Sequence, residues 1–135
     1  MAIIDWDSSL SVNIKSIDNQ HKKLVDMVNT LHDSMKEGKA KDVMGNILAE
    51  LAAYTDYHFK TEEEFFKKYG YAEGVKHKVE HDHLREEVTY LKEKFDRGEA
   101  VFTIELLYFL KDWLSKHILG SDKKYTAFLN SKGVV

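Results

Sequence analysis

The sequence of residues 48–65, LAELAAYTDYHFKTEEEF, carries a helical stripe with two polar interruptions. Its inward positions recur every three or four residues, which is the period of a helix buried on one side. Most of these positions hold Leu48, Leu51, Thr55 and Phe65. The remaining two hold His58 and Glu62, which are four residues apart, so both side chains project from the same face. We therefore expect an imidazole and a carboxylate inside the core.

The same period continues through most of the chain, and proline is absent. It predicts four helices ended by glycine-containing turns: Ile17–Lys36, Lys41–Tyr69, Val75–Arg97 and Val101–Leu119. Ser16 is expected to cap the first of them. The first sixteen residues lack helical spacing and predict an extended arm packed on the outside, and residues 121–130 predict a short helical tail. The expected fold is all-α: an antiparallel up-down-up-down four-helix bundle, with these two extensions, forming one domain over residues 1–135.

Histidines interrupt the inward stripes of the other predicted helices too. His21 lies on the face of Leu24, Val25 and Val28, whereas His77 and His81 open the stripe of Leu84 and Val88, and His117 closes that of Leu107, Leu110 and Leu114. Asp122 is expected to turn back toward His117 because Gly120 breaks the helix. In an antiparallel bundle all of these positions meet at one end.

Composition limits the chemistry and the partners. With 20 Lys and Arg against 23 Asp and Glu, the net charge of −3 provides no basic excess for nucleic acid. The sequence has no cysteine, so a metal would need nitrogen and oxygen ligands. No apolar run is long enough to span a membrane, and the first residues lack the basic charge of a secretory signal. We expect a cytoplasmic protein that binds neither nucleic acid nor membrane.

Burying five imidazoles and two carboxylates together would cost several kcal/mol unless an ion compensates. Imidazole with carboxylate suits iron, manganese, zinc or copper, and seven ligands are too many for one of these ions. Two metals bridged by carboxylates fit the seven residues best. Spacing alone identifies neither the metal nor the division of the ligands between the two ions.

Four motifs resemble those of the hemerythrin family, in particular its single-domain bacterial members. They are Ile17-Asp18-Asn19-Gln20-His21, His58-Phe59-Lys60-Thr61-Glu62, His77-Lys78-Val79-Glu80-His81 and Trp113-Leu114-Ser115-Lys116-His117-Ile118, the last followed by Asp122. The resemblance runs from Trp6 to Tyr125. Two departures, Asn13 where a glycine is common and Ala72 where a proline is common, affect loops rather than ligands.

The resemblance implies two iron ions joined by an oxo or hydroxo bridge. It implies that His77, His81 and His117 bind one iron, that His21 and His58 bind the other, and that Glu62 and Asp122 bridge the pair. The second iron then has an open position for dioxygen. The residues implied to line the dioxygen pocket are Leu24, Phe59, Trp113, Leu114 and Ile118.

The function expected from this resemblance is reversible dioxygen binding for storage, transport or delivery, with no catalytic residue. We expect a monomer that hands dioxygen to a protein recipient. Two alternatives remain: a module that senses oxygen or nitric oxide, and a di-iron enzyme that consumes dioxygen, peroxide or nitric oxide.

Several other polar residues have simpler interpretations. His32 is interpreted as structural, and His83 as solvated. Glu80 and His83 form an E-x-x-H motif of the kind found in di-iron carboxylate enzymes, but only one copy occurs and it points outward. Glu63 and Glu64 are expected to form a solvated face.

Overall fold

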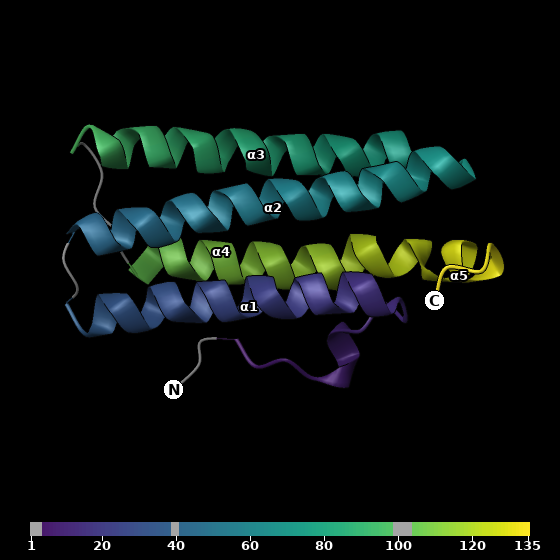
Figure 1. The fold of residues 1–135 in the computed structure, drawn as a ribbon, viewed down its shortest axis with the longest axis horizontal. Coiled ribbons are helices and arrows are strands. Elements are labelled where there is room, and N and C mark those ends of the chain that lie inside the picture. Colours follow the sequence, from purple (N-terminus) through teal and green to yellow (C-terminus); the bar gives the residue numbers. More distant parts are fainter. Residues whose placement is uncertain (1–3, 39–40, 99–103) are drawn as a thin grey trace.

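The computed structural model describes residues 4–38, 41–98 and 104–135. Four long helices run antiparallel to their sequence neighbours, and no strand occurs within these ranges: α1 (Lys15–Lys36), α2 (Lys41–Tyr69), α3 (Gly74–Asp96) and α4 (Ile104–Lys116) (Figure 1). The expected all-α bundle is confirmed. The predicted helix start at Val101 lies outside the described residues. No helix in the described part of the chain has both the length and the apolar character of a membrane span.

The start of α1 differs from the prediction. The helix begins at Lys15, so Ser16 is an exposed residue of its first turn, and the N-cap, Ile14, makes no side-chain cap hydrogen bond. The carboxylate of Asp18 instead accepts hydrogen bonds from the backbone N–H of Val12 (2.8 Å) and the hydroxyl of Ser11 (2.5 Å). The predicted Ser16 cap is therefore wrong. The prediction started the helix at Ile17, its first apolar residue, whereas the helix begins two residues earlier.

The N-terminal arm covers α1 and belongs to the core. It contains one turn of 3-10 helix, η1 (Ser8–Leu10), and buries Ile4, Leu10, Val12 and Ile14. The side chain of Asn29 on α1 bonds both backbone groups of Ile4, at 3.0 and 2.9 Å. Asn13 has a φ of 55°, which glycine adopts freely and asparagine tolerates better than most residues. The asparagine therefore keeps the loop conformation that a glycine would favour.

The chain stays helical beyond α4. Residues His117–Asp122 form a π-helix, η2, and lead directly into α5 (Lys123–Ser131), the predicted tail. Gly120 has no left-handed φ, so the predicted break there is wrong. In a π-helix the hydrogen bonds join residues five apart, so Asp122 returns to the side of His117 without an interruption of the helix.

The predicted core is confirmed along most of its length, with one shift near the end of α2. Phe65 is only half-buried, and Phe66 is buried instead. The ring of Phe66 packs against those of His77 and Tyr125, with centroids 4.9 and 5.4 Å apart. Phe66 therefore closes the core at the end of the bundle that holds the histidines.

Candidate metal centre

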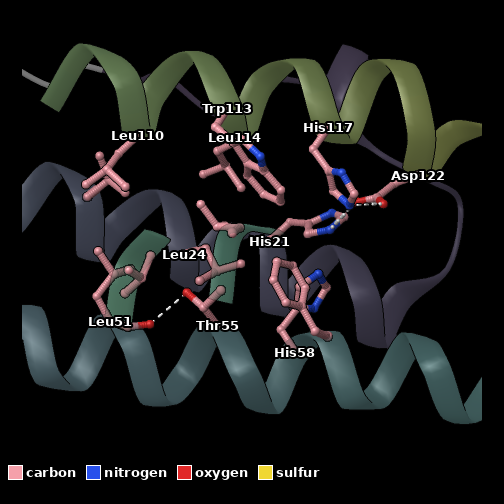
Figure 2. Close-up of a pocket in the computed structure, with 14 residues that line it drawn as sticks. His21, Leu24, Leu51, Thr55, His58, Leu110, Trp113, Leu114, His117 and Asp122 are labelled. Atoms are coloured by element: carbon pink, nitrogen blue, oxygen red, sulfur yellow. Dashed lines mark hydrogen bonds and ion pairs between the residues drawn. The ribbon is translucent and has the colours of Figure 1, made fainter. Parts of the chain in front are cut away.

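Seven buried polar side chains meet at the end of the bundle where α1 begins and α4 ends. Figure 2 labels four of them, His21, His58, His117 and Asp122. Each of the four motifs contributes, from α1, α2, α3 and the η2 turn. The side chains are His21, His58, Glu62, His77, His81, His117 and Asp122. The structure therefore brings together all the residues that the sequence singled out as candidate ligands.

Their donor atoms form two groups that share two carboxylates. The three-histidine group consists of His77, His81 and His117 with Glu62 and Asp122, and the two-histidine group consists of His21 and His58 with the same carboxylates. Within each group, one donor atom per residue lies within 4.8 Å of every other. The arrangement offers five protein donors on one side and four on the other.

The shared carboxylates face histidines of both groups. Asp122 places Oδ1 2.8 Å from Nε2 of His77 and Oδ2 3.0 Å from Nε2 of His21. Glu62 places Oε1 2.9 Å from Nε2 of His58 and 3.6 Å from Nε2 of His81. Each carboxylate can therefore bridge two ions.

Many of these buried atoms lack the hydrogen bonds that burial normally requires. The carboxylate oxygens of Glu62 and Asp122 lie close to histidine nitrogens, yet none of them makes a hydrogen bond of acceptable geometry, and neither do the Nε2 atoms of His21 and His77. Buried polar atoms without partners are rare because each one costs free energy. Coordination of cations would satisfy all of them, so the residues present fit a pair of metal ions.

The electrostatics of His81 and Asp122 agree with this fit, whereas His117 differs: burial acts to lower its pKa, but Asp122, Glu62 and Glu80 outweigh burial and raise it. Burial, together with the neighbouring His117 and His77, holds the pKa of His81 far below its ordinary value, so the imidazole is neutral. Burial also acts to raise the pKa of Asp122, but His117, His21 and His77 outweigh it and lower that pKa well below its ordinary value. Neutral imidazoles and ionised carboxylates are the forms that bind metals.

Three of the histidines have a polar partner outside the cluster. Nδ1 of each faces a side-chain oxygen: His58 and Gln20 at 2.7 Å, His81 and Glu63 at 2.8 Å, His117 and Glu80 at 3.0 Å. Such contacts fix the proton on Nδ1 and leave Nε2 available as a ligand. The expectation that Glu63 is solvated is therefore wrong, because its side chain is only 17% exposed. His83 is exposed, as predicted.

A cavity of about 30 Å³ adjoins the cluster (Figure 2). It touches His21 and His58 of the two-histidine group, and it also touches His117 and Asp122. Much of its apolar wall consists of residues that the sequence placed in the core but not in a pocket: Val28, Leu51, Leu84, Val88 and Leu110. All five lie on the inward helical stripes next to the predicted ligands. Their position on those stripes is the feature of the sequence that could have predicted them as lining residues.

Four of the five residues expected in a dioxygen pocket line this cavity: Leu24, Phe59, Trp113 and Leu114. The fifth, Ile118, is fully buried in the main hydrophobic core and does not line the cavity. Thr55 is the one lining residue with a hydroxyl group, and that hydroxyl donates to the backbone carbonyl of Leu51 at 2.7 Å (Figure 2).

Comparison with known proteins supports the same interpretation. Residues 12–129 match the hemerythrin HHE cation binding domain. A bacteriohemerythrin of Methylococcus capsulatus is 39% identical over 132 residues, covering 97% of this chain and all of the relative. A hemerythrin-like protein of Naegleria gruberi is 34% identical over 125 residues, covering 93% of this chain and 92% of the relative. The crystal structure of a wild-type hemerythrin aligns with a TM-score of 0.90 at 38% identity, covering 93% of this chain and 97% of that one. The chain belongs to the hemerythrin family, whose members hold a di-iron centre.

Proposed function

We propose that the chain binds dioxygen reversibly at a di-iron centre, for storage, transport or delivery. The observation that carries the proposal is the small apolar cavity beside the two-histidine group. When bound, the iron pair supplies the electrons that hold dioxygen and recovers them on release. The protein must hold the ions, admit a small ligand and keep protons away from it.

The seven clustered side chains are the ligands in this proposal. His77, His81 and His117 hold one ion, His21 and His58 hold the other, and Glu62 and Asp122 are shared. The two donor groups support this division. Since the two-histidine group offers one donor fewer, an ion held there would have room for a further ligand.

The cavity has the size and polarity that such a ligand needs. Its volume of about 30 Å³ exceeds the roughly 10–15 Å³ that a single water requires, which leaves room for a diatomic molecule. Leu24, Phe59, Trp113 and Leu114 form the wall that we propose contacts dioxygen. An apolar wall disfavours bulk water and favours an uncharged diatomic ligand.

The lining also supports a carrier rather than an enzyme. The ionisable residues that line the cavity are His21, His58, His117 and Asp122, all of which belong to the metal cluster. The Thr55 hydroxyl is engaged by a backbone carbonyl. Among the described residues that line the cavity, none outside the cluster is ionisable, which favours binding of the ligand over its proton-coupled consumption. The cytoplasmic location, the monomeric state, the protein recipient and the single domain over residues 1–135 stay predictions from the sequence.

Anaerobic loading with ferrous iron, followed by admission and removal of dioxygen, tests the proposal. We expect two irons per chain, a visible absorption that appears with dioxygen and disappears on its removal, and dioxygen uptake matched by release. Net consumption of dioxygen in the presence of a reductant would replace the carrier with an enzyme. Fewer than two irons in fully loaded protein would contradict the paired centre.

A further inference from the structure

Glu63, next to Glu62 in sequence, contacts His81 of the cluster. Its Oε2 lies 2.8 Å from Nδ1 of His81. Both are held in place, since the imidazole is fully buried and the carboxylate side chain is 17% exposed. Because a carboxylate only accepts hydrogen bonds, this contact requires the imidazole proton on Nδ1.

Arg85 of α3 fixes Glu63 in turn. Its Nη1 donates to Oε2 of Glu63 at 2.9 Å and its Nη2 to Oε1 at 3.4 Å, a two-point contact that sets the orientation of the carboxylate. The same guanidinium donates to Asp56 of α2 at 2.8 Å and to Asp82 of α3 at 2.9 Å. Arg85 is therefore held by carboxylates of both helices, so its guanidinium stays in place even if the Glu63 side chain moves.

Arg85 also supports the face of the same imidazole. The ring of Phe59 stacks on His81, with centroids 3.8 Å apart and an interplanar angle of 5°. The guanidinium carbon of Arg85 lies 5.2 Å from the centroid of that Phe59 ring. The imidazole of His81 is thus held at its edge by Glu63 and at its face by Phe59, and Arg85 contacts both supports.

We propose that Arg85 and Glu63 form a positioning pair that holds His81 with its proton on Nδ1 and its Nε2 directed at the metal cluster. The proposal rests on the proposed function in one respect, that His81 is a ligand. The ion pair is not merely a link between α2 and α3, because a link alone would not require contacts on both the edge and the face of one imidazole. Neither Arg85 nor Glu63 touches the cavity, so the role of the pair is positioning and not contact with dioxygen.

Variants at Glu63 separate the proton-holding role from the charge. Glu63→Gln keeps an oxygen that accepts from Nδ1, as Gln20 does for His58, and should retain the Nδ1–H form of His81. Glu63→Ala removes the acceptor. Glu64→Gln, an exposed neighbour that loses the same charge, is the matched control.

The experiment uses the full chain in two loaded forms. In zinc-loaded protein, which is diamagnetic, nitrogen-15 NMR of the histidines reports which ring nitrogen of His81 carries the proton. In iron-loaded protein, transfer of iron to a chelator reports retention. For Glu63→Ala we expect loss of the protected Nδ1–H signal and iron affinity lower by about 10- to 100-fold, whereas Glu63→Gln and Glu64→Gln should keep the signal.

A Glu63→Ala protein that keeps both the Nδ1–H signal and iron retention of the unsubstituted chain would overturn the positioning pair. So would a Glu64→Gln protein that loses them to the same extent. If Glu63→Ala fails to fold, Arg85→Lys replaces it, and an Nδ1–H signal as protected as in the unsubstituted chain would again overturn the pair. Consumption of dioxygen by the unsubstituted chain would defeat the carrier function and leave this result intact.

Discussion

The Nε2 atom of His81 lies 3.1 Å from the Nε2 atom of His117. On the far side of each ring, Nδ1 faces a carboxylate, Glu63 or Glu80. When both protons reside on Nδ1, the two Nε2 lone pairs point at each other, an arrangement that a cation between them would stabilise. A metal ion bound there would supply the positive charge between the two imidazoles.

Removal of metal is expected to destabilise the fold. A site that binds only the folded chain adds about 2.7 kcal/mol when free metal is 100 times the dissociation constant. Calorimetry of the metal-free, zinc-loaded and iron-loaded chain should show rising melting temperatures on loading. His83→Ala, at an exposed position outside the cluster, should show the same rise. Equal melting of the free and loaded forms would contradict this expectation.

Substitution of a ligand that both groups share should remove more ions from the protein than substitution of a ligand that belongs to one group. His21→Ala removes a donor of the two-histidine group alone, so one ion should remain. Asp122→Ala removes a donor of both groups, and neither ion should be retained. Metal analysis after gel filtration measures the ratio, with His32→Ala as a control that keeps both ions. Retention of the same number of ions by His21→Ala and Asp122→Ala would show that Asp122 is not shared.

Enlarging the cavity should shorten the lifetime of the oxygenated form. Leu24→Ala and Leu31→Ala remove the same buried side chain from α1, at a cost of about 2–5 kcal/mol each, but only Leu24 lines the cavity. We expect the visible absorption to decay faster in Leu24→Ala, because water gains access beside the cluster. Equal decay in both variants would mean that the cavity wall does not protect the bound ligand.

Gly120→Ala tests how Asp122 is placed. A Cβ at Gly120 would meet no atom within 4 Å, and its φ is not left-handed, so the alanine should be neutral or stabilise by about 0.4–1 kcal/mol with iron content unchanged. Gly70→Ala is the matched control: it has equal space but a φ of 70°, and should destabilise by about 1–2 kcal/mol. Chemical denaturation measures both. Loss of iron from Gly120→Ala would restore the glycine break as the explanation.

The beginning of α1 offers a further test. Asp18→Ala removes the acceptor for the Val12 N–H and the Ser11 hydroxyl, and should lower the free energy of unfolding by about 1–3 kcal/mol. Ser16→Ala should change it little, since Ser16 is exposed and does not cap the helix. Urea unfolding of the two variants compares the two side chains. A larger loss from Ser16→Ala would contradict the observed hydrogen bonds of Asp18.

The helical period predicted the bundle and the convergence of the seven polar residues, because a helix with one buried face has apolar residues every three or four positions in its sequence. The same period failed at the η2 turn. A stripe drawn at the α-helical angle turns Asp122 away from His117, and the sequence carries no separate mark of a π-helix, so a glycine break was inferred instead.

The outer partners of the histidines were missed for a different reason. Glu63 and Glu80 lie at the edges of their helix faces, where a single stripe assigns residues to solvent. A weaker signal existed in α2: Asp56, Phe59 and Glu63 follow one another at three and four residues, which makes a second stripe beside the first. Both carboxylates of that stripe contact Arg85, and Phe59 contacts His81.

Because the helix is unbroken through η2, Asp122 is directly connected to α5, which packs in the core and contacts the N-terminal arm. Tyr125 and Leu129 follow Asp122 on α5 and are fully buried, and Thr126 donates to the backbone carbonyl of Val12, 114 positions earlier. We therefore expect Asp122 to move away from the cluster only when α5 detaches from the core. Amide hydrogen exchange in α5 would measure how often that opening occurs.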